Sequence, residues 1–395
     1  MRRCSSSRPD KLGDRSDGSR ADRTTKRPVI RWIVALAQRS FAHGHAGPLN
    51  RNGTLVVVME TRRVNLALQG GGAHGAFTWG VLDRLLNDPR LEIDGISATS
   101  AGAVNAVVLA HGLTVGGREG AANLLAEFWQ RVAQVAEWGA LRPSWLDRLT
   151  RNYGLEHSPS YFLFDLMSRV FSPYQFNPCN YNPLKPLLEN VVDFEGLRRR
   201  CAIKLFVCAT NVRTGKLRVF TNEEICATHV LASACLPLYS QAIEVAGEHY
   251  WDGGYLGNPA LFPLIYGCKS PDIIVVHINP NERPAIPKTA QEIINRINEI
   301  SFNSSLLREM RAIAFVTRLI DEGKVTDGSL KRMFVHAIEA DDAMQQLGPM
   351  SQFNAEWDFL RYLHDIGAER AERWLATHLD RVGEASTVDI RAKYL

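Results

Sequence analysis

The pattern of apolar and polar positions changes period several times along the chain, and each change separates a predicted strand from a predicted helix. Residues 64–69 alternate as a half-buried strand does, and residues 76–88 repeat apolar side chains every three or four positions, as an amphipathic helix does. A second strand is predicted at 91–99, followed by an apolar helix at 101–113 and a further helix at 123–138. This part of the chain therefore predicts alternating strands and helices.

The later part of the chain continues this alternation and adds two hairpins. Residues 203–221 have the pattern of one hairpin and residues 242–254 that of a second. Residues 272–279 form a continuous apolar run, which suits a strand that is buried on both faces. The pattern predicts an α/β domain over about residues 62–345, with a layered, largely parallel sheet and helices on both faces.

Three further segments carry apolar residues whose environment the pattern does not specify. Residues 160–184 are rich in Phe, Tyr and Leu, and could either form an acyl-chain channel or cap, or pack into the main core. Residues 292–320 have a helical apolar stripe. Core packing is predicted for it, because an interfacial helix usually carries more Lys and Arg. Residues 346–395 are predicted to be a C-terminal helical segment, with 355–379 as a pair of appended helices. The apolar stripe within 292–320 consists of Ile293, Ile297, Ile300, Leu307 and Met310.

Charge is distributed unevenly between the first 58 residues and the rest. Residues 1–58 contain 12 Lys and Arg against 4 Asp and Glu, whereas the whole chain has a formal net charge of +4, so the remainder is net negative. This basic extension is poor in apolar residues, apart from 29–37. It is therefore predicted to be disordered and dispensable, with Met59 as the natural start. The remainder has no basic excess, so no nucleic-acid partner is expected.

The cysteines and the hydropathy of the chain narrow its expected location. The seven cysteines are odd in number and lack C-x-x-C spacing, which argues against a disulfide framework or a zinc site and suits a reducing compartment. No run of about 18 or more apolar residues occurs, so no membrane-spanning helix is predicted. The expectation is a cytoplasmic protein that contacts a membrane only peripherally, if at all.

A glycine-rich loop follows the first predicted strand and precedes the first helix. Gly70, Gly72 and Gly75 satisfy G-x-G-x-x-G. Asp94 follows about 20 residues later, as in a dinucleotide-binding motif. In that motif the acidic residue closes the second strand, whereas here the predicted strand continues past Asp94 towards Ser100. The loop is therefore either a nucleotide site or a place where another ligand approaches the backbone closely.

The segment ISATSAG places Ser100 where a predicted strand turns into a helix. With Gly102 two residues on, this is the arrangement of a nucleophile elbow, in which a tight turn raises the serine hydroxyl above the sheet and directs the helix N-terminus at it. The usual pattern is G-x-S-x-G, and Ala98 replaces its first glycine. Taken alone, the segment fits equally well a helix N-terminus capped by a hydroxyl.

An Asp-Gly-Gly sequence lies at the end of another predicted strand. By themselves, Asp252, Gly253 and Gly254 match an ordinary Asp-Gly turn, which is common. The glycine loop, the elbow serine and Asp-Gly-Gly nevertheless occur in this order, each at a predicted strand end. The ordered set favours a catalytic interpretation over three unrelated turns.

This ordered set resembles the patatin-like phospholipase family, acyl hydrolases that use a Ser–Asp dyad. The resemblance covers about residues 64–280 and includes the hairpin at 208–220 and an Ala-Ser…Pro segment at 231–245. It implies a layered patatin-like sheet, with Ser100 as the nucleophile and Asp252 as the base.

The resemblance also implies roles for the other motif residues. The oxyanion hole is formed by the glycine loop, through Gly70, Gly71 and Gly72. His74 departs from the pattern, because many relatives carry Arg or Lys there. The resemblance implies a lipid, phospholipid or other acyl-ester substrate, peripheral membrane contact and no metal or cofactor, and it leaves the oligomeric state open. The supporting residues of the three motifs are Gly75, Ala98, Gly102, Gly253 and Gly254.

The expected mechanism is attack by Ser100 on an ester carbonyl while Asp252 accepts its proton and backbone N–H groups stabilise the oxyanion. An aspartate with an ordinary pKa of about 3.9 is a weak base at neutral pH, so burial and a hydrogen bond to the serine are expected. A Ser–Asp–His triad that adds His277 is the mechanistic alternative. The alternative of another class is a protein that binds a nucleotide or an acyl group through the loop without hydrolysis.

Overall fold

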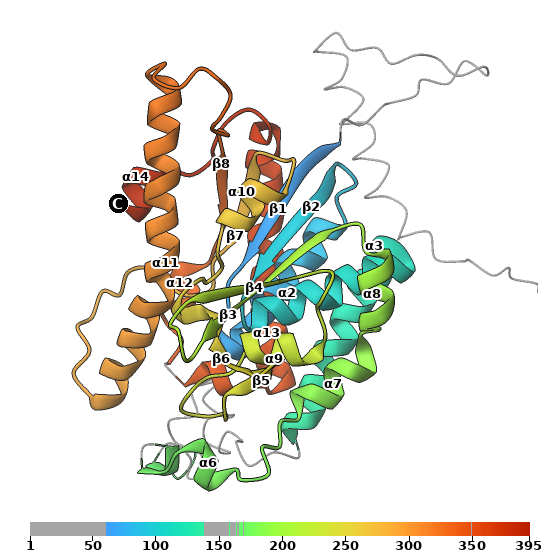
Figure 1. The fold of residues 1–395 in the computed structure, drawn as a ribbon, viewed down its shortest axis with the longest axis vertical. Coiled ribbons are helices and arrows are strands. Elements are labelled where there is room, and N and C mark those ends of the chain that lie inside the picture. Colours follow the sequence, from blue (N-terminus) through green and yellow to red (C-terminus); the bar gives the residue numbers. More distant parts are fainter. Residues whose placement is uncertain (1–60, 138–157, 159–162, 164–165, 169, 349) are drawn as a thin grey trace, which may run out of the picture. The chain divides into compact units, whose positions relative to one another are not determined.

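A computed structural model describes residues 61–137, 158, 163, 166–168, 170–348 and 350–395 (Figure 1), so the extension predicted at residues 1–58 lies outside the described residues. The described residues contain a mixed sheet of eight strands, ordered β5-β6-β3-β2-β1-β7-β8, with β4 paired to β3. Pairs along β3-β2-β1-β7-β8 are parallel, and those of β4, β5 and β6 are antiparallel. The strands are β1 (Arg62–Leu68), β2 (Leu91–Ala98), β3 (Lys204–Asn211), β4 (Leu217–Thr221), β5 (Ile243–Val245), β6 (Glu248–Asp252), β7 (Asp272–Val276) and β8 (Phe334–Ile338).

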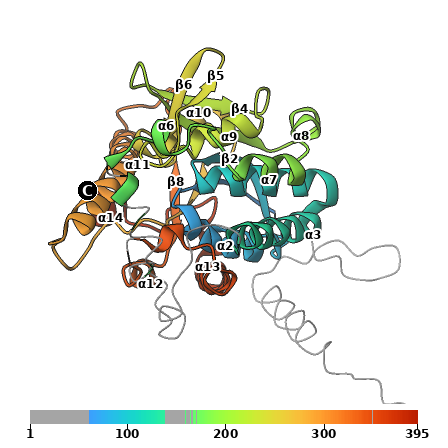
Figure 2. The ribbon, with the colours of Figure 1, turned by 90° about the horizontal axis from the view of Figure 1, so that it is seen from below.

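Helices lie on both sides of this sheet. The longer ones are α2 (Gly75–Leu86), α3 (Ala101–Glu137), α7 (Leu184–Val191), α8 (Phe194–Arg200), α9 (Ala227–Ser233), α11 (Ala290–Asp321) and α13 (Trp357–His378). The shorter ones are α6 (Pro173–Phe176), α10 (Phe262–Gly267), α12 (Asp341–Met344) and α14 (Ile390–Tyr394), with 3-10 turns η1 (Gly72–His74), η2 (Gly253–Tyr255), η3 (Ser351–Phe353) and η4 (Leu379–Arg381). Figures 1 and 2 show α2, α3 and α13 grouped on the same side of the sheet. The predicted fold class, an α/β protein with a mostly parallel layered sheet and C-terminal helices, is confirmed.

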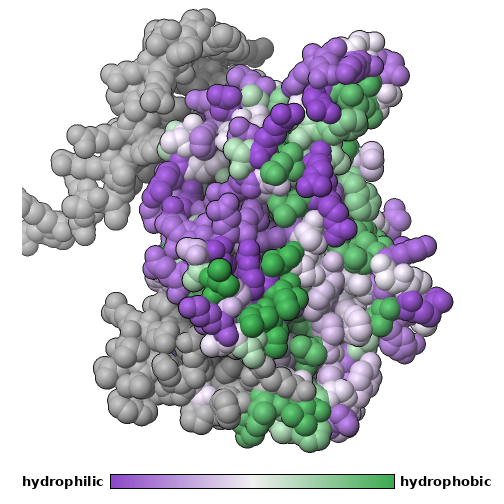
Figure 3. Space-filling model, turned by 90° about the vertical axis from the view of Figure 1, so that its left-hand side faces the viewer, coloured by the Kyte–Doolittle hydropathy of each residue, from purple (hydrophilic) through white to green (hydrophobic). Residues whose placement is uncertain are grey.

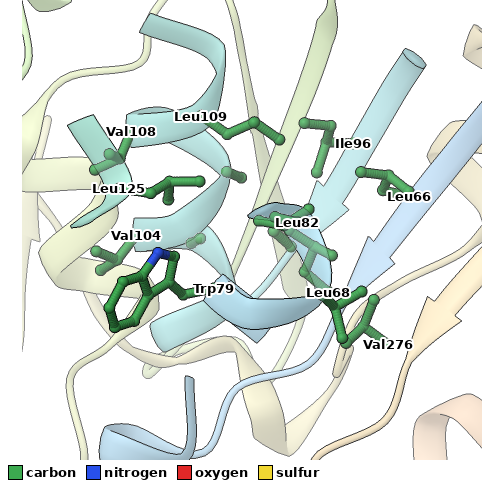
Figure 4. Packing of buried hydrophobic residues seen from close by; sticks show 14 of the residues in the cluster. Leu66, Leu68, Trp79, Leu82, Ile96, Val104, Val108, Leu109, Leu125 and Val276 are labelled. Atoms are coloured by element: carbon green, nitrogen blue, oxygen red, sulfur yellow. The ribbon is translucent and has the colours of Figure 1, made fainter. Parts of the chain in front are cut away.

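The two faces of the sheet are buried in two separate apolar clusters. Leu66 and Leu68 of β1 pack with side chains of α2 and α3 (Figure 4), in a cluster that also includes side chains of α13. Ala67 between them belongs to a second cluster with side chains of α10, α11 and α14. The residues of β7 divide between the clusters in the same alternating way. Burial on both faces explains why β7 reads as a continuous apolar run in the sequence.

The C-terminal helix α13 packs along α2 at very short range. A Cβ placed on Gly80 would lie 1.9 Å from the carbonyl oxygen of His364, and one placed on Gly367 would lie 2.1 Å from that of Phe77. The two glycines therefore allow the helix backbones to approach closely. The prediction of a helix pair at 355–379 is wrong, because this stretch is a single helix whose apolar side belongs to the same core as α2.

One strand was missed by the sequence prediction, and two predicted helices adjoin at a break. Strand β8 was not predicted, and it extends the parallel part of the sheet beyond β7. The helices predicted at 101–113 and 123–138 are present within α3, where a non-helical backbone conformation at Gly117 separates the two, and residue 138 lies outside the described residues. No helix among the described residues is both long enough and apolar enough to cross a membrane.

The apolar stripe predicted at 292–320 lies on α11, but the prediction of core packing is wrong for its first half. The side chains of Ile293, Ile297 and Ile300 are 42%, 59% and 55% exposed, whereas Met310 is fully buried. The helix therefore buries one part of its stripe and presents the other part to solvent.

The described part of the aromatic segment 160–184 is also largely exposed. Its large apolar side chains with substantial exposure are Leu163, Leu166, Val170, Phe171, Tyr174 and Tyr181. Packing of this segment into the main core is therefore not the correct interpretation for the residues that the structure describes.

Candidate active site

The structure brings the three sequence motifs together at the ends of neighbouring strands. Leu68 and Ala98, the last residues of the parallel strands β1 and β2, are paired with each other. The chain continues from them into the glycine loop and into Ser100. A Cβ placed on Gly70 would lie 2.5 Å from the Cβ of Ser100, so the loop and the serine are in direct contact. Asp252 ends β6, which pairs with the far end of β3.

Ser100 occupies a strained turn between β2 and α3. Its φ is 55°, in the left-handed region that residues with a side chain seldom adopt. The Ser100 N–H donates to the Ser233 hydroxyl at 2.9 Å, which helps to hold the turn. A Cβ placed on Gly102 would lie 2.3 Å from the Leu68 carbonyl oxygen, so glycine is needed for α3 to begin against the end of β1. These features are those of a nucleophile elbow.

Ala98 fits the elbow without crowding it. The residue is fully buried and belongs to the cluster formed with α2 and α3. Its partners in the sheet are Leu68 on β1 and Val207 on β3. The departure from the usual glycine therefore adds a methyl group to the apolar core.

Asp252 is fully buried, and its two carboxylate oxygens differ in their hydrogen bonding. Oδ1 accepts a hydrogen bond from the Gly254 N–H at 2.7 Å, whereas Oδ2 is buried with no partner of normal hydrogen-bond geometry among the described residues. Burial raises the pKa of Asp252 to about 7, and the Gly254 N–H and the Ser100 hydroxyl act in the opposite direction. Gly253 allows this turn, because a Cβ there would lie 2.2 Å from the Cys208 carbonyl oxygen.

The three glycines of the predicted oxyanion hole differ in what their N–H groups contact. The Gly70 N–H donates to Asn258 Oδ1 at 2.7 Å, so this donor is already engaged. The N–H groups of Gly71 and Gly72 donate to no other residue that the structure describes, and both glycines line the same cavity as Ser100. They are the loop donors available to a ligand. Gly75 lies below the loop, where its Cα faces the Ala101 side chain.

The cavity at Ser100 is small and covered. Its volume is about 80 Å³, which is well below the roughly 300–1,000 Å³ of pockets for drug-sized ligands. Arg283 links two of its walls, since it donates to the Gln345 carbonyl at 2.8 Å and forms an ion pair with Glu299 at 2.6 Å. The wall residues from α11 and from the segment before α13 are Asn295, Asn298, Glu299, Phe302, Met344, Gly348 and Gln352.

A larger cavity, of about 500 Å³, lies beside the second half of α11. Its apolar lining includes Phe262, Tyr266 and Ile313, and it contains neither Ser100 nor Asp252. Size alone would select this cavity as the ligand site, but the elbow serine, Ser100, lines the smaller one.

The two histidines near the site, His277 and His74, are hydrogen-bonded to residues other than Ser100 and Asp252. His277 Nε2 lies 2.6 Å from the Tyr394 hydroxyl, and burial together with Lys393 lowers the pKa of His277 to about 3. His74 lines the cavity, where its Nε2 lies 2.7 Å from the Ser351 hydroxyl, and burial lowers its pKa to about 4. A neutral His74 cannot supply the positive charge that Arg or Lys would supply at this position.

His277→Gln is expected to leave kcat essentially unchanged, because His277 is bonded to Tyr394. The same change is expected to lower the free energy of unfolding by about 1–3 kcal/mol, since it disturbs a buried hydrogen bond. Steady-state kinetics and thermal unfolding of the purified variant measure the two effects. Loss of most of kcat in a folded His277→Gln protein would show that a triad operates instead.

Asp94 does not take the position of a nucleotide-binding acid. It lies within β2, which continues past it to Ala98, as the sequence indicated. Its Oδ2 accepts from the N–H groups of Lys269 and Ser270. It therefore anchors the loop that leads into β7.

Sequence reasoning missed three residues that shape the site. Asn258 binds the Gly70 N–H, Ser233 binds the Ser100 N–H, and Gln352 covers Gly72, whose added Cβ would lie 2.4 Å from the Gln352 carbonyl oxygen. Ser233 lies in the Ala-Ser…Pro segment, and Asn258 closely follows Asp-Gly-Gly, so position relative to the motifs was an available signal for both. No such signal was available for Gln352, because it lies far from the three motifs in the sequence.

The fold and the site together describe an α/β protein with an elbow serine and a buried aspartate. A family model described as patatin-like phospholipase matches residues 66–265, half of the chain. The chain belongs to the patatin-like phospholipase family, whose members are typically lipid acyl hydrolases.

Comparison with solved structures finds distant similarities. The crystal structure of VipD from Legionella pneumophila matches with 13% identity and a TM-score of 0.35, covering 89% of this chain and 76% of that chain. The complex of full-length SpcU with full-length ExoU, from the type III secretion system of Pseudomonas aeruginosa, matches with 16% identity and a TM-score of 0.29, covering 84% and 73%. No curated protein sequence matches the chain. The family assignment therefore rests on the family model.

Proposed function

We propose that the protein hydrolyses acyl esters of lipids or phospholipids through a Ser100–Asp252 dyad. The observation that carries the proposal is an elbow serine at φ 55° together with a fully buried aspartate whose Oδ2 has no other partner in the part of the chain that the structure describes. A buried carboxylate without a partner is costly, so its position beside a serine is best explained by a role in proton transfer.

The reaction follows from this arrangement. Ser100 Oγ attacks the ester carbonyl while Asp252 accepts the hydroxyl proton, and the tetrahedral oxyanion is stabilised by the N–H groups of Gly71 and Gly72. Asp252 then returns the proton to the leaving alcohol, and the acyl group remains on Ser100. Water attacks the acyl-enzyme with Asp252 again as base, which releases the fatty acid and restores the serine.

The pKa of about 7 makes Asp252 an adequate base at neutral pH. The dyad needs Asp252 deprotonated, so kcat/KM for a soluble ester is expected to rise about tenfold per pH unit below this pKa and to level off above it. A rate profile from pH 4 to 9 tests this expectation. A profile without an inflection between about pH 6 and 8 would contradict Asp252 as the base.

Lipid as the substrate class is supported by family membership, and the small volume of the cavity at Ser100 adds a requirement for substrate binding. A cavity of about 80 Å³ has no room for a long acyl chain. We therefore expect the walls contributed by α11 and by the segment before α13 to separate when a long-chain substrate binds. Short esters should need less separation and should react without a lipid surface.

A fluorophosphonate probe tests the proposed function directly. The wild-type protein should become labelled and should hydrolyse a short-chain nitrophenyl ester, and Ser100→Ala should lose both properties. Ser329→Ala, at an exposed serine, is the matched control and should retain both. Labelling and hydrolysis that persist in Ser100→Ala would overturn the proposal, and binding of a nucleotide without labelling would support the non-hydrolytic alternative.

A further inference from the structure

One face of α11 combines exposed isoleucines with exposed arginines. Along this helix, steps of three or four residues place the relevant positions on a common face. The exposed half of the stripe comes first, with Ile293, Ile297 and Ile300, and the same face continues towards the C-terminal end of the helix. The later members are Ser304, Arg308, Arg311, Phe315 and Arg318, of which all but Ser304 are exposed. Together, these eight residues form the Ile–Arg face of α11.

The arginines of the Ile–Arg face are not neutralised within the described part of the chain. Arg308 donates to the Ser304 carbonyl, and the Arg318 guanidinium lies 5.4 Å from the centre of the Phe315 ring. None of the three arginines forms an ion pair with a carboxylate that the structure describes. The face therefore presents three positive charges next to an apolar stripe.

The acidic residues of α11 are engaged away from this face. Glu299 forms ion pairs with Arg283 and Arg296, and Glu309 accepts hydrogen bonds from two backbone N–H groups near α10. At the two ends of the helix, Glu292 accepts from the Thr289 N–H and Asp321 pairs with Arg332. The positive charge of the Ile–Arg face is therefore not balanced on the helix itself.

The opposite side of the same helical turns lines the catalytic cavity. Asn295, Asn298 and Phe302 form part of the cavity wall, and they alternate along α11 with Ile293, Ile297 and Ile300 on its outer side. Leu238, another residue of the wall, is 51% exposed. The helix that carries the Ile–Arg face therefore also supplies part of the wall of the cavity that holds Ser100.

We propose that the Ile–Arg face docks the protein on a phospholipid bilayer that contains anionic lipids. The isoleucines enter the boundary between headgroups and acyl chains, and the arginines contact the anionic headgroups, as in helices that lie in a membrane interface. Docking by this face brings α11, whose opposite side lines the catalytic cavity, to the lipid surface. This inference names the surface that supplies the substrate, and its relevance to catalysis rests on the proposed function.

The surface around α11 agrees with this use. Figure 3 faces the side of the molecule on which α11 lies, and it shows apolar side chains gathered in patches among hydrophilic ones. Exposed apolar patches of this kind mark binding surfaces for proteins or membranes. A second copy of the chain would meet the same three positive charges on its own Ile–Arg face, whereas an anionic bilayer is complementary to both parts of the surface.

Vesicle co-sedimentation with the full chain tests the proposal. All proteins carry Ser100→Ala, so that lipid remains intact, and vesicles are of phosphatidylcholine alone or of phosphatidylcholine mixed with phosphatidylglycerol. Ile297→Gln with Ile300→Gln should lower partition into both vesicles about tenfold or more, because two apolar side chains no longer enter the interface. Arg308→Gln with Arg311→Gln and Arg318→Gln should lower partition about tenfold or more into the anionic vesicles only.

Matched substitutions elsewhere control for changes in apolar area and in charge. Val115→Gln on α3 and Arg373→Gln on α13 alter side chains of comparable exposure, 56% and 59%, and should leave partition unchanged. Partition that is equal in the wild-type chain and in both sets of Ile–Arg variants would overturn the proposal. A smaller particle in analytical ultracentrifugation for the isoleucine variant, with unchanged partition, would assign the face to a second copy instead.

Catalysis is measured separately, so that the two proposals can fail independently. With Ser100 intact, the Ile–Arg variants should hydrolyse a soluble short-chain ester at the wild-type rate. If the wild-type chain turns over the soluble ester normally and the Ile–Arg substitutions do not change vesicle binding, the docking proposal alone is overturned. Normal vesicle binding with no turnover in the wild-type chain would overturn the hydrolase and leave docking in place.

Discussion

Asp252→Asn is expected to lower kcat by about 10²–10⁴-fold while the protein remains folded. The amide has nearly the same shape as the carboxylate and can still accept from the Gly254 N–H through its oxygen. It cannot accept the Ser100 proton, and its NH₂ group would face the serine in place of Oδ2. The loss should therefore appear in kcat, with little change in KM.

Above neutral pH, Asp252→Asn is expected to stabilise the folded protein, although it lowers kcat. The pKa of Asp252 is about 7 in the folded protein, against an ordinary value of 3.8. Its contribution to stability is fully present below about pH 4 and is lost as pH rises through 7, because the folded state holds the proton more tightly. At about 1.4 kcal/mol per pKa unit, the difference amounts to several kcal/mol. Asp252→Asn should therefore have a higher Tm than the wild type at pH 8, and a similar Tm at pH 4.

Glu309→Gln provides the matched control for this prediction. Burial also raises the pKa of Glu309 to about 7, but this residue lines the larger cavity, away from Ser100. It should show a similar dependence of Tm on pH and a wild-type kcat. If Asp252→Asn retained most of its activity, another group would have to take the serine proton.

The sequence could predict the reactive centre because each of its parts lies at the end of a strand. Leu68, Ala98 and Asp252 end their strands, and in each case glycines follow that allow a tight turn against neighbouring backbone. Such turns require particular residue types locally, so a short stretch of sequence is informative. Burial of Asp252 was also expected, because an exposed aspartate would be too weak a base.

What surrounds the centre could not be predicted, because it depends on contacts between distant segments. The α11 stripe illustrates this limit. A period of 3.6 residues shows that Ile293, Ile297 and Met310 share a stripe, but it does not show which part of the stripe another element covers. Met310 meets the sheet and the isoleucines meet solvent. The engagement of Gly70 by Asn258 is another contact of this kind.

Gly72→Ala is expected to lower kcat by about 10²–10³-fold, with a smaller effect on KM. The Gly72 N–H is one of the two free donors of the loop, and an oxyanion exists mainly in the transition state. Two features of the structure make the position sensitive. Its φ is 58°, and an added Cβ would lie 2.4 Å from the Gln352 carbonyl oxygen, so the loop or the covering segment must shift.

The conformational cost of the new methyl group must be separated from the loss of the donor. Gly323 has nearly the same backbone conformation, with φ of 66° and no atom within 4 Å of an added Cβ. Gly323→Ala therefore measures the cost of alanine at positive φ alone, about 1–2 kcal/mol of stability, and should leave kcat unchanged. A larger fall in Tm for Gly72→Ala would report the additional conflict with Gln352.

Steady-state kinetics of Gly72→Ala, beside a nucleotide titration of the wild type, then distinguishes the two uses of the loop. If the loop bound a nucleotide, the substitution would weaken that binding and leave ester hydrolysis unaffected, because no oxyanion would form there. If Gly72 supplies an oxyanion donor, kcat falls whether or not a nucleotide is present, and the fall exceeds any caused by Gly323→Ala. A normal kcat in a folded Gly72→Ala protein would exclude this N–H from the oxyanion hole, and Gly71 would then be the remaining free donor in the loop.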